Sequence, residues 1–135
     1  MPKTICFILL FSVLCHISCD EHPLQYKRIE YLGYRVRYEA TGDLDTLLIR
    51  YVDENGSYTR LDTTSLPFVY EFDKIDDFYA ELTASSLGQS GSIIASIYTN
   101  DKLFLSDSMR SPNPLVVVNG TIRGLSFSTI VTETR

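Results

Sequence analysis

The side chains best suited to chemistry are carboxylates that fall close together in the chain. They form three groups: Asp43 with Asp45, Asp53 with Glu54, and Asp73 with Asp76 and Asp77. Paired carboxylates can exchange protons with a substrate or hold a calcium ion. All three groups fall where we predict turns, and aspartate is common in turns because it hydrogen-bonds to its own backbone. We therefore interpret these acids as turn residues.

Histidine and cysteine lie outside the predicted domain. The histidines are His16 and His22, and the cysteines are Cys6, Cys15 and Cys19. A domain without these residue types has neither a catalytic triad of the usual kind nor a zinc site. The sequence therefore predicts a protein that is not an enzyme and that uses no metal or other cofactor.

The start of the chain has the pattern of a secretory signal peptide. Lys3 gives a positive charge, residues 5–17 form an apolar run, and Ser18 is a small residue before Cys19. As a helix the run would span roughly 20 Å, whereas a bilayer core is roughly 30 Å thick, so a stable transmembrane helix is disfavoured. The segment resembles a bacterial lipoprotein signal, although His16 stands where that family usually has an aliphatic residue.

Cys19 is the residue that we predict to carry a lipid. In an exported protein it would otherwise be a lone free thiol at the mature terminus. The alternatives are an uncleaved anchor helix and cleavage near Ser18 without a lipid. The resemblance implies attachment to membrane lipid in the bacterial cell envelope, facing the periplasm or the cell surface. Residues 1–18 are then a signal peptide, residues 19–31 a lipid-anchored tether, and residues 32–135 the folded domain.

The charge of the chain argues against nucleic acid as a partner. The sequence has 12 Lys and Arg residues against 17 Asp and Glu residues, a formal net charge of −5. A domain that binds nucleic acid needs a basic surface, which this composition does not supply.

Alternation of apolar and polar residues predicts a β-domain. Residues 34–41 follow a period of two, as expected of a strand with one buried face. Residues 72–85 fit a helix in part, but we predict a turn over 74–77 and a strand over 78–85. Asn-Gly at 55–56 and at 119–120 predicts two hairpin turns. Eight or nine short strands at regular spacing predict an antiparallel β-sandwich. Four residues on the apolar phase are predicted to be core: Ile49, Leu82, Ile93 and Ile97.

The chain resembles the mycobacterial small membrane protein (MmpS) family over roughly residues 34–105. The matching segments are 38–42, 51–56, 65–68, 71–72, 82–84 and 91–98. The resemblance implies an immunoglobulin-like β-sandwich outside the membrane. It also implies a role as accessory or adaptor protein of a large inner-membrane exporter of lipids or siderophores. This chain departs from the family in its lipoprotein-like leader and in the turn 100–102, which lacks the family's glycine.

Exposed aromatic side chains are the remaining candidates for binding a partner. Tyr34, Tyr38 and Tyr51 fall on apolar faces and are predicted to be core. Tyr58, Tyr70 and Tyr79 fall on the opposite phase, where exposed aromatic rings often mark binding surfaces. Pro67 suits the start of an edge strand, which would place Phe68 beside an edge open to a partner. The candidate partner contacts are Phe68, Tyr70 and Tyr79.

Three functions remain open. The first is a non-catalytic, lipid-anchored adaptor of an exporter or of another envelope protein. The second is a surface-exposed module that binds a glycan or a protein, which a patch of exposed tyrosines would favour. The third is an enzyme, which would require a buried carboxylate pair in a cleft.

The predicted anchor can be tested by replacing its cysteine. We expect Cys19→Ala to abolish incorporation of a radioactive fatty acid and to change membrane fractionation, because the substitution removes the acylated sulfur. Equal label in the wild-type and substituted proteins would contradict the prediction.

Overall fold

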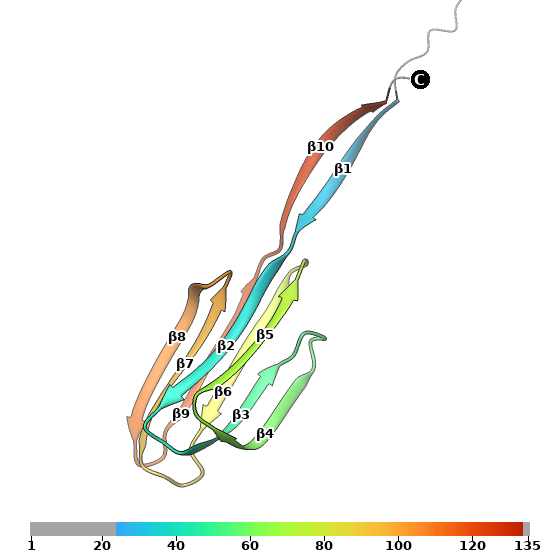
Figure 1. Ribbon diagram of the computed structural model, residues 1–135. Coiled ribbons are helices and arrows are strands. Elements are labelled where there is room, and N and C mark those ends of the chain that lie inside the picture. Colours follow the sequence, from blue (N-terminus) through green and yellow to red (C-terminus); the bar gives the residue numbers. More distant parts are fainter. Residues whose placement is uncertain (1–23, 134–135) are drawn as a thin grey trace, which may run out of the picture. The chain divides into compact units, whose positions relative to one another are not determined.

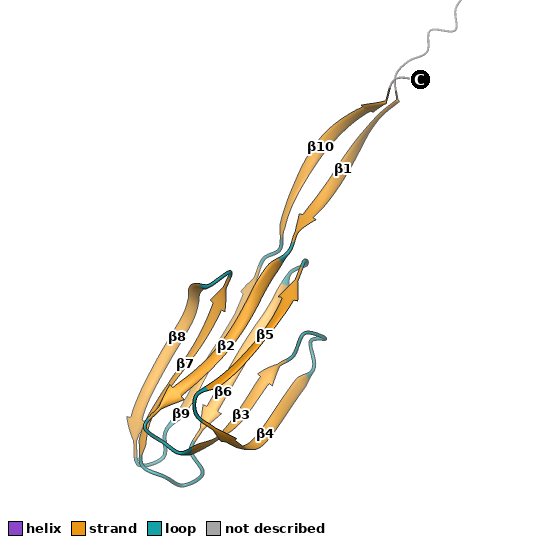
Figure 2. Ribbon diagram, in the orientation of Figure 1, coloured by secondary structure: helices purple, strands orange, loops and turns teal. Residues whose placement is uncertain are grey.

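The structure, a computed structural model, describes residues 24–133 and consists of strands without helices (Figures 1 and 2). The described residues fall into two compact units: residues 29–127 form one, and residues 24–28 with 128–133 belong to the other. The strands are β1 (Leu24–Leu32), β2 (Tyr34–Gly42), β3 (Thr46–Val52), β4 (Tyr58–Ser65), β5 (Phe68–Lys74), β6 (Phe78–Ser85), β7 (Gly91–Thr99), β8 (Lys102–Ser111), β9 (Leu115–Ile122) and β10 (Leu125–Glu133). The predicted all-β class is confirmed.

The predicted signal peptide and Cys19, the predicted site of lipidation, lie outside the described residues. Residues 24–31, the end of the predicted tether, lie in β1, which pairs with β10 in a two-stranded sheet. Between residues 24 and 133, the structure has no helix long and apolar enough to cross a membrane.

Two antiparallel sheets of four strands make up the larger unit. One has the strand order β5-β2-β7-β8, and the other has the order β4-β3-β6-β9. The chain changes sheet between β2 and β3 and changes back between β4 and β5. Strands β4 and β5 are therefore edge strands joined by residues 66–67, so the predicted edge near Pro67 is present.

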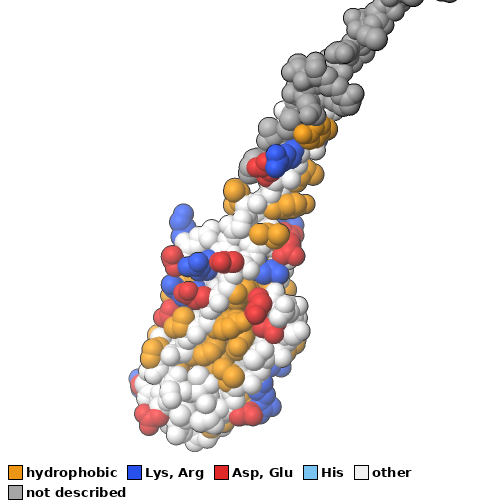
Figure 3. Space-filling model, turned by 45° about the vertical axis from the view of Figure 1, so that its right-hand side comes forward, with side chains coloured by type: hydrophobic (Ala, Val, Ile, Leu, Met, Phe, Trp, Pro, Cys, Tyr) orange, Lys and Arg blue, Asp and Glu red, His pale blue; other side chains and the backbone are white. Residues whose placement is uncertain are grey.

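Alternating side chains create the core between the sheets. In β2, Tyr34, Val36 and Tyr38 are buried, whereas the residues between them are more exposed to solvent. Ile49, Leu82, Ile93 and Ile97 are all fully buried, as predicted from their phase. Leu61, Leu66, Tyr70 and Phe72 are half-buried against the same core. Figure 3 shows hydrophobic side chains along the middle of the sandwich, with charged side chains around them.

Aromatic rings join the two sheets. Tyr51 of β3 lies 5.9 Å from Tyr38 of β2 and 4.6 Å from Tyr70 of β5, measured between ring centroids. Phe72 and Phe78 meet edge to face at 5.2 Å. Aromatic pairs in these arrangements add to the energy of burial. The buried Tyr38 hydroxyl donates to the carbonyl oxygen of Val52 at 2.9 Å, so this polar atom is satisfied inside the core.

Two tight turns use backbone conformations that few residues favour. Gly56 has a φ of 78° in the turn after β3, and Asp53 Oδ1 accepts the N–H groups of Asn55 and Ser57 there. Asn100 and Asp101 both have positive φ, 48° and 63°. This is the backbone of a two-residue hairpin turn, which asparagine and aspartate adopt more readily than most residues. The turn at 100–101 thus forms without the family's glycine.

The predicted hairpin at 119–120 is wrong. Both residues lie inside β9, where they pair with Glu81 and Ala80 of β6. Gly120 serves packing here, because a Cβ at this position would lie 2.8 Å from Leu105 Cδ1. The chain breaks instead between β9 and β10, where the Gly124 N–H donates to Asp77 Oδ1 at 2.9 Å.

The core assignment can be tested within one strand. We expect Ile97→Ala to lower the free energy of unfolding by about 2–5 kcal/mol, because it removes buried methyl groups and leaves a cavity. Ile94 lies on the same strand, is 45% exposed and serves as the matched control. Its replacement by Ala should change stability by about 0.5 kcal/mol or less. Equal losses for the two variants in chemical denaturation would contradict the phase assigned to β7.

Candidate functional site

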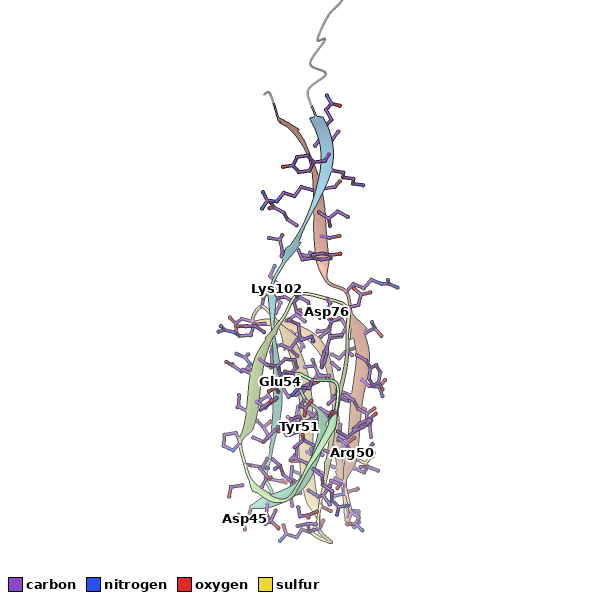
Figure 4. The ribbon with its side chains drawn as sticks, turned by 90° about the vertical axis from the view of Figure 1, so that its right-hand side faces the viewer. Asp45, Arg50, Tyr51, Glu54, Asp76 and Lys102 are labelled. Atoms are coloured by element: carbon purple, nitrogen blue, oxygen red, sulfur yellow. The ribbon has the colours of Figure 1, made fainter. Side chains whose placement is uncertain are left out.

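The outer face of the β4-β3-β6-β9 sheet gathers polar and aromatic side chains. Tyr58 of β4 pairs with Val52 of β3, and Tyr51 pairs with Leu82 of β6. Side chains at Arg50 and Glu81 therefore point away from the core side chains Tyr51 and Leu82. Figure 4 shows Tyr51 toward the middle of the body and Arg50 at its outer side. We call Arg50, Tyr58, Tyr79 and Glu81 the Glu81 cluster.

Three side chains donate hydrogen bonds to the Glu81 carboxylate. Tyr79 donates its hydroxyl proton to Oε2 at 2.8 Å, and Tyr58 donates to the same oxygen at 3.3 Å. Arg50 Nη2 donates to Oε1 at 3.0 Å. These donors come from three neighbouring strands, so the register of the sheet sets the geometry of the cluster.

Burial differs sharply within the cluster. Glu81 is only 7% exposed, whereas Tyr58 is 59% and Tyr79 45% exposed. A buried carboxylate is costly unless it is paired and hydrogen-bonded, and the cluster supplies both partners. The Arg50 guanidinium also lies over the Tyr58 ring, with 5.0 Å between its carbon and the ring centroid. The result is two exposed rings held in place by a buried charge.

The Glu81 charge changes the acidity of its neighbour. The hydrogen bond from the Tyr79 hydroxyl to Glu81, together with desolvation and the charge of the carboxylate, raises the pKa of Tyr79 above its ordinary value. A pKa that is higher in the folded state adds stability below the ordinary tyrosine pKa of about 10, and this stability is lost as the pH rises through the folded-state value. Tyr79 therefore keeps its hydroxyl proton, and with it the hydrogen bond to Glu81, at neutral pH.

Thr83 adds a second polar feature to this face. It pairs with Arg50 across the sheet and stands two residues after Glu81 in β6. Its hydroxyl oxygen is buried and has no hydrogen-bond partner within the described part of the chain. Buried polar groups are nearly always paired, so this hydroxyl is an exception, and its burial closes it to a ligand on the surface.

A hollow of about 300 Å³ opens beside the cluster, and we call it the Tyr58–Tyr79 hollow. Its lining consists of Val52, Asn55, Gly56, Tyr58, Lys74, Asp77, Phe78 and Tyr79. Lys74 Nζ lies 5.2 Å from the centroid of the Phe78 ring and donates to the carbonyl oxygen of Glu54 at 3.2 Å. The hollow therefore combines aromatic rings with charged and amide groups.

A larger, wider hollow of about 690 Å³ lies near the start of β2. Its charged residues pair with each other: Arg35 with Asp73 at 3.2 Å, and Lys74 with Asp76 at 3.3 Å. The ring of Tyr34 is buried, and its hydroxyl donates to the Asp76 carbonyl oxygen at 2.6 Å. Because its aromatic ring is buried, this hollow is the weaker candidate.

The predicted acidic turns behave mostly as expected. Asp43 Oδ1 accepts the Ser92 N–H at 2.5 Å, a bond that lowers the pKa of this carboxyl, and Asp43 Oδ2 pairs with Arg110 at 2.9 Å. Asp73 differs, because it lies in β5 and not in a turn. Across residues 24–133, no three His, Cys, Asp or Glu side chains are grouped so that they could hold a metal ion.

The three predicted partner contacts have different surroundings. Phe68 is 8% exposed and packs 5.6 Å from Tyr51, so it is a core residue and not an accessible contact. Tyr70 is half-buried, and its hydroxyl donates to Glu54. That hydrogen bond is the main cause of the raised pKa of Tyr70. Only Tyr79 has the exposure that a contact requires, and it lies in the Glu81 cluster.

Sequence reasoning did not identify Arg50 or Glu81 as site residues. The alternation along each strand could have shown that they face outward, because each stands next to a core residue. The sequence does not give the pairing of β3 with β6, which brings the two charges together.

Comparison with known proteins adds no family. No family model matches the sequence, and no curated protein matches it. The resemblance to the MmpS family therefore stays a prediction drawn from the residues.

The cluster makes a prediction about tyrosine acidity. We expect Glu81→Gln to lower the pKa of Tyr79 toward its ordinary value, because the amide still accepts a hydrogen bond but carries no charge. The measurement is a pH titration of tyrosinate absorbance in the wild type and in Glu81→Gln, each with and without Tyr79→Phe. Subtracting the curve of the Tyr79→Phe protein leaves the titration of Tyr79 alone. The same midpoint for Tyr79 in both backgrounds would show that Glu81 does not set its acidity.

Proposed function

We propose that this protein is a non-catalytic binding module of the bacterial cell envelope, anchored to membrane lipid through acylated Cys19. The observation that carries the proposal is the pair of exposed tyrosines, Tyr58 and Tyr79, held by the buried Glu81 carboxylate. Large aromatic rings with a polar end are common in binding surfaces, and here the hydrogen bonds hold both rings in place before a ligand arrives.

The cluster is better suited to binding than to turnover. Glu81 accepts three hydrogen bonds, so both of its oxygens are already engaged. General acid–base catalysis needs a group free to exchange a proton with the substrate. The buried carboxylate pair that would favour an enzyme is replaced here by one carboxylate paired with Arg50.

The family resemblance supports a narrower form of the proposal. An exporter or another envelope protein as partner, and an immunoglobulin-like class for the sandwich, are both implied by the resemblance to the MmpS family. The sheets here have four strands each, whereas the constant-type immunoglobulin domain has four and three. The proposed binding function rests on the exposed tyrosines of the Glu81 cluster and does not require an exporter.

The test is recovery of an envelope component by the tagged, full-length protein after brief crosslinking in cells. We expect recovery to fall for the double variant Tyr58→Ala/Tyr79→Ala, because it removes the exposed rings and leaves Glu81 in place. Tyr31→Ala is the matched control, since Tyr31 is a tyrosine of β1 that is 60% exposed.

Sugar and protein analysis of the recovered material identifies its class and shows whether a transporter copurifies. Recovery that is equal for the wild type, the double variant and the control would contradict a binding role for this face.

A further inference from the structure

We infer that the ligand of the Glu81 cluster is a neutral saccharide, held across the Tyr58–Tyr79 hollow; the inference rests on the proposed binding function and names its ligand class. A sugar ring has an apolar face of C–H groups and an equatorial belt of hydroxyls. It therefore needs an aromatic surface beside groups that both donate and accept hydrogen bonds.

Two tyrosine rings supply the aromatic surface of the hollow. Tyr58 and Tyr79 both line it, and each leaves about half or more of its surface exposed, at 59% and 45%. Their hydroxyls are held by the same Glu81 oxygen, which fixes the rings and limits the side-chain entropy lost on binding.

The charges around the hollow balance each other. Arg50 neutralises Glu81 at 3.0 Å, and Lys74 and Asp77 contribute one charge of each sign to the lining. Lys74 lies 3.3 Å from Asp76, and Asp77 lies 3.8 Å from Arg123. A site that pairs its own charges attracts neither an anion nor a cation strongly, and this favours a neutral ligand.

Two side-chain amides, one in the lining and one beside the cluster, match sugar hydroxyls in kind. Asn55 in the lining is exposed, and Asn119 faces Glu81 across β6 and β9 and is also exposed. Each side-chain amide both donates and accepts, as a sugar hydroxyl does. The volume of about 300 Å³ lies at the lower end of the range for ligand pockets, which suits one or two sugar rings and not a large ligand.

A peptide fits this face less well. Extended peptides gain most of their affinity by adding a strand to a sheet edge through main-chain hydrogen bonds. Of the cluster, Tyr58 alone lies on an edge strand, β4, whereas Arg50, Tyr79 and Glu81 lie on β3 and β6, the two inner strands of the sheet. The backbone groups of these strands already bond to neighbours on both sides, so a peptide laid across the face gains no ladder bonds.

Matched pairs of small sugars test the inference with the detergent-solubilised full-length protein. The probes are N,N′,N″-triacetylchitotriose with its cationic counterpart chitotriose, and lactose with its anionic counterpart sialyllactose. Saturation-transfer NMR detects binding, and calorimetry measures the affinity. We expect at least one neutral probe to bind and its charged counterpart to bind more weakly.

Variants of the two tyrosines show whether binding occurs at this site. We expect Tyr79→Ala and Tyr58→Ala each to weaken binding by about tenfold, which corresponds to about 1.4 kcal/mol. Tyr79→Phe keeps the ring and should retain most of the affinity, whereas Tyr31→Ala should have no effect. Circular dichroism confirms that each variant is folded.

Three results would overturn the inference: no binding of any neutral probe, preference for the charged probes, or binding that Tyr58→Ala and Tyr79→Ala leave unchanged. If an envelope protein is nevertheless recovered in a tyrosine-dependent way, the ligand is a protein and the proposed binding function stands. If nothing binds in a tyrosine-dependent way, both fail.

Discussion

Burial of aromatic and aliphatic side chains between two sheets is the constraint on which this structure depends. Tyr38 stands at its centre: its ring contacts those of Tyr51, Tyr70 and Phe72, and its hydroxyl bonds to the Val52 carbonyl oxygen. The domain that the structure describes has no cysteine with which to form a disulfide. Side-chain packing, together with the hydrogen bond from Tyr38 to Val52, must therefore hold the two sheets together.

The same strands that build this core also present the candidate site. In β3, Tyr51 points into the core while Arg50 points outward, and in β6 the same is true of Leu82 and Glu81. A fully packed inner face fixes the strand register, because a slip of one residue would exchange the two faces. Precise placement of the Glu81 cluster thus follows from the packing of residues on the opposite side of the sheet.

The sequence predicted much of the fold because its signals are local. Alternation along 34–41 and 78–85 places β2 and β6 correctly, and the buried state of Ile97 follows from its phase. The Asn-Gly pair at 119–120 misled the prediction, because glycine can serve a close contact as well as a turn. The site itself depends on which strands become neighbours, and that arrangement comes from long-range pairing that no local pattern encodes.

The close contact at Gly120 also limits which substitutions β9 can accept. Along β9, Leu115 and Val117 are about half exposed, so polar replacements there alter little of the packed interior. At Gly120 even one added carbon would meet Leu105 Cδ1 at 2.8 Å and Phe104 Cε1 at 3.2 Å. Tolerance to substitution should therefore alternate along β9: exposed positions such as Leu115 and Val117 accept change, whereas a side chain at Gly120 requires Leu105 and Phe104 to shift.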